Sequence, residues 1–344
     1  MIVIMQHGAS DAQIGHVIER VKQLRLTPHV SRGQFRTIIG AIGDKQPAHQ
    51  QILEALDGVE RVVPIMKPFK LASREFHADD TSVQVGPVRI GPPGVTIIAG
   101  PCAVESAEAL DRIARAVAAG GAAMLRGGAF KPRTSPYDFQ GLGEDGLKLL
   151  RAAGDALGMP IVSEALAVAD VALVERYVDM FQVGARNMQN YNLLKEVGDT
   201  GKPVLLKRGM AATIREYLMS AEYILSRGNH NVVLCERGIK SFETEVRFTL
   251  DVSAVPVLKH HCHLPVLVDP SHAAGNRAYV SALALAGVAA GADGIIVEVH
   301  DRPEEALCDG PQALLPEAFA ELVGRIGRVA AALGRSLASP AGES

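Results

Sequence analysis

The chain has 344 residues, 48% of them hydrophobic and 21% charged, with a net charge of −3. This composition is typical of a soluble globular protein, and the slightly negative charge excludes a protein that binds nucleic acid over its whole surface. No apolar run reaches the roughly 18–20 residues that a membrane span requires, and the N-terminus lacks a secretory signal. The four cysteines form no CxxC pair, so we expect no structural zinc knot and a reducing, cytoplasmic setting.

Residues 1–67 predict the order strand, helix, strand, strand, helix, strand. We expect the first helix to start at Asp11, with this residue as its N-cap. The expected strands are 2–5, 27–31, 35–41 and 59–65, and the second helix is 48–56. This order indicates a ferredoxin-like α+β domain. The polar segment 68–81 is expected to be a linker.

The pattern changes from residue 82 onward. A short hairpin at 83–91 is followed by apolar strands that alternate with Ala- and Leu-rich helices. The expected strands are 95–99, 122–125, 160–163, 180–183, 204–207, 232–235, 266–268 and 294–297. Eight such units within 82–344 predict a (β/α)8 TIM barrel. A doubly wound open sheet is the alternative, which we disfavour because no glycine fingerprint opens the first helix.

Polar or charged residues follow nearly every expected barrel strand, where such barrels carry their active site. The densest group is 125–136, in which Arg126, Lys131 and Arg133 accompany two glycines and Pro132. Cations directly after a buried strand indicate a small, multiply anionic substrate, whereas a solvated basic loop would seldom carry such Gly and Pro residues. The cations in question are Arg126, Lys131, Arg133, Arg186, Lys207, Arg208 and Arg237.

A second group mixes sulfur, nitrogen and oxygen donors. Cys102, His272 and Glu298 follow the first, seventh and eighth strands, which are neighbours in a closed barrel, and Asp309 follows in the last loop. Singly, each could be a core thiol, a satisfied polar residue or the partner of an arginine. Together they favour a divalent transition metal over magnesium. The run 259–263 (Lys-His-His-Cys-His) precedes the seventh strand, so we expect it to be a loop at the opposite rim without a catalytic role.

These motifs resemble the type I beta 3-deoxy-D-arabino-heptulosonate 7-phosphate (DAHP) synthases that carry an N-terminal ferredoxin-like domain. The matching segments are 100–106, 126–135, 184–190, 206–209, 269–272 and 308–310. The resemblance implies a transferase that condenses phosphoenolpyruvate with D-erythrose 4-phosphate to DAHP plus phosphate, the first step of the shikimate pathway to aromatic amino acids. The sister family, 3-deoxy-D-manno-octulosonate 8-phosphate synthase, uses arabinose 5-phosphate and typically has Asn-Arg where this chain has Pro132-Arg133. A non-catalytic sugar-phosphate-binding barrel is the third hypothesis.

The resemblance also implies roles for single residues. It assigns one divalent metal ion (Mn, Fe, Co or Zn-like) to Cys102, His272, Glu298 and Asp309. It assigns phosphoenolpyruvate to Arg126, Lys131, Glu164 (through water), Arg186, Lys207 and Arg237. It assigns erythrose 4-phosphate to Arg133, Thr134 and Ser135, with Asp301 near its hydroxyls. Cys102 and His272 are then catalytic through the metal, and Lys131 is our candidate for proton transfer to the aldehyde oxygen.

Residues 1–67 hold no catalytic constellation. Their expected fold resembles amino-acid-sensing modules, which in this subfamily are associated with feedback inhibition by aromatic amino acids. His29 and Ser31, after the first helix, are the candidate effector contacts, and an ordinary polar loop is the alternative. We also expect a homo-oligomer, a dimer or a tetramer, and we note that Cys308 could form a disulfide with Cys102 on oxidation.

Overall fold

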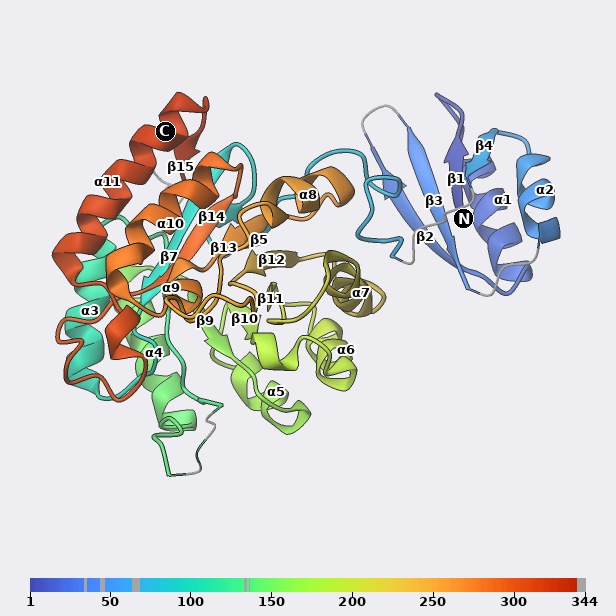
Figure 1. Ribbon diagram of the computed structural model, residues 1–344. Coiled ribbons are helices and arrows are strands. Elements are labelled where there is room, and N and C mark those ends of the chain that lie inside the picture. The colour runs from blue at the N-terminus through green and yellow to red at the C-terminus, as the bar shows by residue number, and fades with distance from the viewer. Residues whose placement is uncertain (34–35, 44–46, 64–68, 133–134, 136, 339–344) are drawn as a thin grey trace. The chain divides into compact units, whose positions relative to one another are not determined.

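The computed structural model describes all residues except 34–35, 44–46, 64–68, 133–134, 136 and 339–344. Contacts between residues divide the chain into two compact units. The first consists of Met1–Asp79 with His261–His263, and the second of Asp80–His260 with Leu264–Ser344. Figure 1 labels the elements of both units along the chain.

The first unit is a four-stranded antiparallel sheet with two helices, which confirms the predicted ferredoxin-like fold. The strand order is β2-β3-β1-β4. Side chains of both helices share one apolar core with the sheet, for example Val17, Leu53 and Ile39. The elements are β1 (Ile2–Met5), α1 (Asp11–Gln23), β2 (Thr27–Arg32), β3 (Thr37–Ile42), α2 (Pro47–Glu54) and β4 (Val59–Val63).

The N-cap of α1 is Ser10, so the expected cap Asp11 is wrong by one residue. Ser10 Oγ accepts a hydrogen bond from the Gln13 backbone N–H at 3.3 Å, and the Ser10 N–H donates to Gln13 Oε1 at 2.9 Å. This reciprocal capping box satisfies two helix-terminal donors at once. Asp11 occupies the first turn, where a carboxylate is favourable.

Residues 69–79, within the segment expected to be a linker, lie in the first unit and contain buried side chains. Phe69, Leu71 and Phe76 are each at most 5% exposed. The ring of Phe76 packs on Gly40 of β3, where a Cβ atom would lie 2.7 Å from it. This stretch therefore adds apolar contacts to the first unit.

The second unit is a closed barrel of eight parallel strands, as predicted. The strands follow one another in chain order, and pairing of the last with the first, for example Ile296 with Ile98, closes the barrel. The strands are β7 (Gly94–Gly100), β8 (Met124–Arg126), β9 (Ile161–Glu164), β10 (Met180–Val183), β11 (Val204–Lys207), β12 (Val232–Glu236), β13 (Val266–Val268) and β14 (Gly294–Glu298).

Two further strand elements attach to the barrel. The expected hairpin is formed by β5 (Val83–Val85) and β6 (Val88–Ile90), and its apolar side chains pack against interior side chains of the barrel. The two-residue strand β15 (Ser336–Leu337) pairs with the start of β7. Sequence patterning does not indicate β15, because two residues are too short to show a period.

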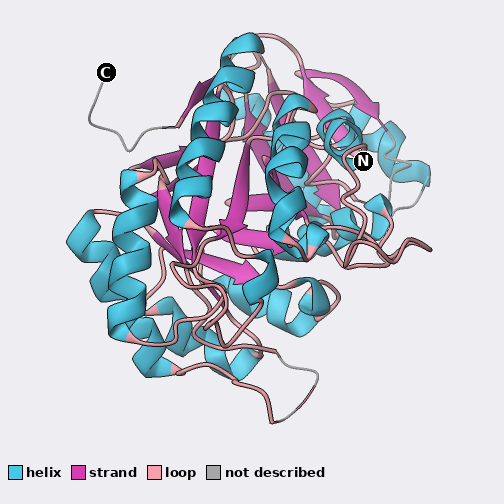
Figure 2. Cartoon of the chain, turned by 60° about the vertical axis from the view of Figure 1, so that its left-hand side comes forward, coloured by secondary structure: helices cyan, strands magenta, loops and turns pink. Residues whose placement is uncertain are grey.

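Amphipathic helices surround the barrel strands, as Figure 2 shows. The helix α3, for example, buries Leu110, Ile113 and Val117. None of the helices in the described part of the chain is both long and apolar enough to cross a membrane. The helices are α3 (Ala107–Ala119), α4 (Glu144–Leu157), α5 (Val168–Glu175), α6 (Tyr191–Asp199), α7 (Ile214–Leu225), α8 (Ala254–His261), α9 (Pro270–Ala274), α10 (Arg277–Ala289) and α11 (Pro316–Ala332), with short 3-10 turns η1 (Ala185–Asn187) and η2 (Gly310–Gln312).

The first three residues of the run 259–263 form the end of α8, so the expected loop is mostly helical. The helix forms because Ala254, Val255 and Leu258 bury one apolar face. His263 then packs against the first unit's own residues, with Nε2 2.7 Å from the Leu71 carbonyl oxygen. Within the described residues, this run belongs to no group that could hold a metal ion.

The hydroxyl of Tyr217 contacts the backbone of both β11 and β12. These strands pair in parallel register, Leu206 with Leu234 and Lys207 with Cys235. The Cys235 N–H donates to the Tyr217 hydroxyl at 2.6 Å, and the hydroxyl lies 2.6 Å from the Leu206 carbonyl oxygen and 3.3 Å from the Cys235 carbonyl oxygen. These contacts lie immediately before Lys207 and Glu236.

At the opposite rim, Asp293 holds two cations. It is fully buried and pairs with Lys259 Nζ at 2.8 Å and Arg335 Nη2 at 3.0 Å. It also accepts the Val266 backbone N–H at 2.9 Å. We expect Asp293→Ala to lower the free energy of unfolding by about 3 kcal/mol, because it leaves two partly buried charges without their carboxylate.

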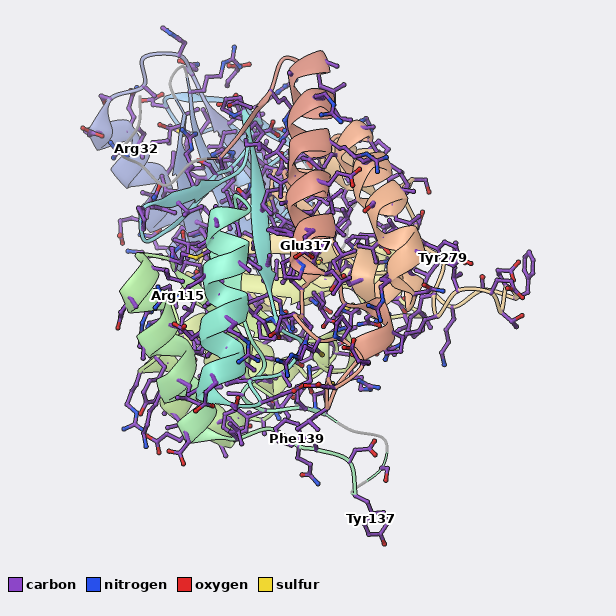
Figure 3. All side chains as sticks on the ribbon, turned by 90° about the vertical axis from the view of Figure 1, so that its left-hand side faces the viewer. Arg32, Arg115, Tyr137, Phe139, Tyr279 and Glu317 are labelled. Carbon is purple, nitrogen blue, oxygen red and sulfur yellow. The ribbon has the colours of Figure 1, made fainter. Side chains whose placement is uncertain are left out.

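Urea denaturation of the full-length chain measures this change. The matched control is Asp111→Ala, which removes an exposed pair with Arg115 on the outer face of α3 (Figure 3) and should change stability by about 0.5 kcal/mol or less. Equal effects of the two substitutions would contradict the prediction.

Candidate active site

A cavity of about 220 Å³ lies at the carboxyl ends of the barrel strands. Its walls come from the loops after most of the strands, as expected for the active face of a TIM barrel. The predicted site residues that line it are Lys131, Glu164, Arg186, Lys207, Arg237, His272 and Asp309.

Four donor atoms gather beside this cavity. Cys102, His272, Glu298 and Asp309 each offer one ligand atom, and these atoms all lie within 4.8 Å of one another. His272 Nε2 is 3.3 Å from Glu298 Oε1 and 3.8 Å from Asp309 Oδ2. Cys102 Sγ lies 3.4 Å from Asp309 Oδ2. One thiol, one imidazole and two carboxylates are a donor set that fits a divalent transition metal.

The backbone places each of these four residues. Cys102 follows β7, and Glu298 is the last residue of β14. His272 stands in the first turn of α9, whose N-cap Asp269 accepts the His272 backbone N–H at 3.0 Å. Asp309 has φ of 53°, a left-handed conformation that asparagine and aspartate tolerate better than other non-glycine residues.

The electrostatics keep His272 neutral and Glu298 charged. Burial lowers the pKa of His272 despite the opposing effect of Asp269 and Glu298. Burial would raise the pKa of Glu298, but the positive charges of His272 in its protonated form, of Arg126 and of Lys131 outweigh burial and lower this pKa. Both residues are therefore in the protonation states that bind a metal at neutral pH. Hydrogen bonding to Cys308 and burial raise the pKa of the Cys102 thiol; the two sulfur atoms are 3.3 Å apart.

Lys131 lines the cavity and also contacts a residue of the donor set. Its Nζ donates to Cys102 Sγ at 3.0 Å and to the Cys102 carbonyl at 3.1 Å. Burial would lower the pKa of Lys131, but the sulfurs of Cys102 and Cys308 raise it above the ordinary value. Gly128 leaves room for this approach, because a Cβ atom there would lie 2.8 Å from both the Cys102 carbonyl and Lys131 Cδ.

Four of the predicted cations are almost fully buried: Arg126, Lys207, Arg208 and Arg237. Arg126 pairs with Glu298 Oε1 at 2.6 Å, and Lys207 pairs with Asp269 Oδ2 at 2.5 Å. Arg237 stacks on Phe248 at 4.3 Å, and its Nη1 has no hydrogen-bond partner among the described residues. An unpartnered buried guanidinium nitrogen beside a cavity is a strong indication of an anionic ligand.

Glu164 is the acidic residue that faces these cations. Its Oε2 accepts a hydrogen bond from Gln182 at 2.7 Å, and both residues line the cavity. Gly184 on the next strand end allows this position, because a Cβ atom there would lie 2.1 Å from Glu164 Oε1.

Arg208, one of the cations expected to bind an anion, is held by two carboxylates in this structure. Its Nη1 donates to Glu236 Oε2 at 2.7 Å and to Asp251 Oδ2 at 2.8 Å, and it is absent from the cavity lining. A buried guanidinium requires such partners. These carboxylates lie 28 and 43 residues away along the chain, so local patterning does not reveal them.

The residues predicted to contact the aldose phosphate are only partly placed. Arg133 and Thr134 lie outside the described residues. Ser135 is described, and its Oγ accepts the backbone N–H of Tyr137, which stands at the tip of the loop between β8 and α4 (Figure 3). Asp301 lines a separate hollow and pairs with Arg112 at 2.6 Å, so this structure does not bring it into the cavity.

The candidate effector residues lie on a strand. His29 and Ser31 belong to β2, at the edge of the sheet of the first unit, and pair with Gly40 and Ile38 of β3. Because alternate residues of a strand share a face, both side chains lie on the same side of the sheet. Both are half-buried.

Three polar residues of the site are not evident from the sequence. Asp269 Oδ2 lies 2.8 Å from His272 Nδ1 as well as beside Lys207. Gln312 Nε2 donates to Glu298 Oε2 at 2.6 Å. Arg247 Nη1 donates to Asp309 Oδ1 at 3.3 Å. Asp269 belongs to the same short motif as His272, which is a usable signal, whereas Gln312 and Arg247 are linked to the site only through the fold.

Comparison with known proteins gives matches over both units. The family model described as the DAHP synthetase I family matches residues 75–329, and the model of the DAHP synthase ferredoxin-like domain matches residues 1–67. Phospho-2-dehydro-3-deoxyheptonate aldolase of Thermotoga maritima is 52% identical over 334 residues, which cover 97% of this chain and 99% of the relative. A 2-dehydro-3-deoxyphosphooctonate aldolase of Syntrophobacter fumaroxidans is 32% identical over 248 residues, covering 67% of this chain and 85% of the relative.

Solved structures agree with these matches. A crystal structure of the Thermotoga maritima phospho-2-dehydro-3-deoxyheptonate aldolase (DAHP synthase) covers 98% of both chains with 50% identity and a TM-score of 0.78. A truncated form of the 3-deoxy-D-arabino-heptulosonate 7-phosphate synthase from the same organism covers 78% of this chain and 99% of its own, with a TM-score of 0.74. The chain therefore belongs to the DAHP synthetase I family and carries the family's ferredoxin-like domain at its N-terminus.

Proposed function

We propose that this chain catalyses the condensation of phosphoenolpyruvate with D-erythrose 4-phosphate, which yields DAHP and inorganic phosphate at the entry to the shikimate pathway. One observation carries the proposal: buried cations face a cavity that adjoins a four-residue metal-ligand set. Two anionic substrates need such cations, and an aldehyde that accepts a carbon nucleophile needs an electrophile next to its oxygen.

Phosphoenolpyruvate is held by Arg126, Lys131, Arg186, Lys207 and Arg237, with Glu164 acting through water. Arg237 has the unpartnered Nη1, and Arg186 has no ion-pair partner among the described residues, so both can receive carboxylate or phosphate oxygens without breaking a bond. Fixing this anion next to the aldehyde turns the condensation into an effectively unimolecular step. The carbon attack leaves a cationic carbon that water captures, and the phosphohemiketal so formed loses phosphate.

Cys102, His272, Glu298 and Asp309 would hold one divalent metal ion of the Mn, Fe, Co or Zn type. The chemistry that an ion bound there supplies is Lewis-acid polarisation of the aldehyde oxygen, an effect of several kcal/mol on the developing alkoxide. Asp269 orients the His272 ring, since its Oδ2 lies 2.8 Å from Nδ1 and leaves Nε2 to face the set.

Lys131 supplies the proton to the aldehyde oxygen. Its Nζ lies 3.0 Å from Cys102 Sγ, so it stands beside the donor set while lining the cavity. Lysine is protonated at neutral pH, which is the form a general acid requires. Arg133, Thr134 and Ser135 hold the aldose phosphate. Asp301, which pairs with Arg112 in this structure, would have to leave that pair to contact the hydroxyls of the aldose.

The aldose can be identified by phosphate release from phosphoenolpyruvate. We expect kcat/KM with erythrose 4-phosphate to exceed that with arabinose 5-phosphate by about 10² or more, the range that differential contacts at a built site achieve. The reverse preference would identify the octulosonate enzyme, whose relatives are 32% identical to this chain. Release with neither aldose would favour a non-catalytic binding barrel.

The metal-ligand set is tested by Cys102→Ala. We expect this variant to lose bound metal and most turnover, because one of four ligands and the only sulfur in the set disappears. Metal content by elemental analysis and phosphate release measure the two effects. Cys262→Ala, which removes a buried thiol outside the set, is the matched control. A Cys102→Ala enzyme with full metal content and turnover would refute the assignment.

The N-terminal domain acts as a sensor of an aromatic amino acid, with His29 and Ser31 as contacts. We expect tyrosine or phenylalanine to inhibit the full chain and not a variant without residues 1–67. His29→Ala and Ser31→Ala in the full chain should raise the inhibitory concentration without changing kcat. Equal insensitivity of the full and shortened chains would overturn the regulatory role.

A further inference from the structure

Glu298 and Asp309 each turn one oxygen toward the donor set and the other away from it. Glu298 Oε1 lies 3.3 Å from His272 Nε2, and Asp309 Oδ2 lies 3.4 Å from Cys102 Sγ. The outward oxygens are Glu298 Oε2 and Asp309 Oδ1. Gln312 Nε2 donates to the first at 2.6 Å, and Arg247 Nη1 donates to the second at 3.3 Å.

The two supporting side chains are also bonded to each other. Arg247 Nη1 donates to Gln312 Oε1 at 3.1 Å. This bond fixes which way the amide of Gln312 points, because only its nitrogen can donate to Glu298. Gln312 is 2% exposed. The result is a continuous chain of contacts from Glu298 through Gln312 and Arg247 to Asp309.

The backbone anchors both ends of this chain. Gln312 lies in η2, and the Gln312 N–H donates to the Asp309 carbonyl at 3.2 Å. Arg247 comes from the connection between β12 and α8, and its N–H donates to the Ala274 carbonyl at 3.1 Å, at the end of the helix that carries His272. Gly275 permits this approach, since a Cβ atom there would lie 2.6 Å from Arg247 Cβ.

We propose that Arg247 and Gln312 form a bridge that sets the separation and orientation of the two carboxylate ligands, Glu298 and Asp309. The inference rests on the proposed metal site and adds two positioning residues to it. Neither residue supplies a ligand atom; each is hydrogen-bonded to the outward oxygen of one carboxylate. Their effect is to hold two like-charged groups in a geometry ready for a cation, which free carboxylates would avoid through repulsion.

Metal affinity of the full-length, metal-stripped protein tests the bridge. The dissociation constant for Zn²⁺, measured by competition with a chelating dye, should rise about 10- to 100-fold in Arg247→Ala and in Gln312→Ala, the usual loss when a group that orients a ligand is removed. Arg302→Ala is the control. It removes an arginine from the connection between β14 and η2, which also carries Asp309. The exposed partner of Arg302 is Glu305, so the dissociation constant should stay unchanged.

The double variant shows whether Arg247 and Gln312 act together as a bridge or support the two carboxylates independently. If the two residues act as one unit, Arg247→Ala with Gln312→Ala should weaken Zn²⁺ binding by clearly less than the product of the two single effects. A full product would overturn the bridge. Co²⁺ gives a second readout: its thiolate absorption should keep its shape in both single variants and require more Co²⁺ to saturate, since Cys102 is untouched.

The outcomes also separate this inference from the proposed function. If the wild-type protein binds Zn²⁺ and both single variants bind it with the same affinity, the bridge alone is overturned. Wild-type protein that binds no Zn²⁺ overturns the metal site and the bridge together. Should Gln312→Ala fail to fold, as judged by thermal unfolding, Arg247→Ala decides by itself, because Arg247 is a half-exposed side chain.

Discussion

Pairing of buried charges at the carboxyl ends of the barrel strands is the constraint on which the site depends. Arg126 of β8 pairs with Glu298 of β14, Lys207 of β11 with Asp269 after β13, and Arg208 with Glu236 of β12. Burying a cation this deeply costs much less free energy when such a partner is present. Because each partner comes from a different strand, the cluster exists only once the barrel has closed.

The same pairs connect the two halves of the site. Glu298 pairs with Arg126 and also belongs to the donor set. Asp269 pairs with Lys207 and also lies next to His272. A ligand that draws Arg126 or Lys207 toward its own oxygens changes the charge around two residues of the donor set. Glu298 and Asp269 therefore connect the buried cations Arg126 and Lys207 with the donor set.

The sequence predicted those parts of the site that depend only on the order of strands and helices. Parallel strands alternating with helices predict the barrel, and the rule that its chemistry lies after the strands correctly brought Cys102, His272, Glu298 and Asp309 together. The partners of individual charges could not be predicted this way. Arg208 looks like Lys207 in the sequence, yet one is bound by Glu236 and Asp251 and the other lines the cavity. The local sequence pattern predicts that a side chain lies at the end of a given strand. Its direction there depends on carboxylates that are distant in the chain.

The hydroxyl of Tyr217 has a consequence for the rim of the barrel. It accepts a hydrogen bond from the Cys235 N–H and lies 2.6 Å from the Leu206 carbonyl oxygen, so a side chain of the outer helix α7 is bonded to both β11 and β12. Lys207 and Arg237 follow these bonds directly in the chain, and both line the cavity. A shift of α7 would therefore act on the two strand ends that carry these cations.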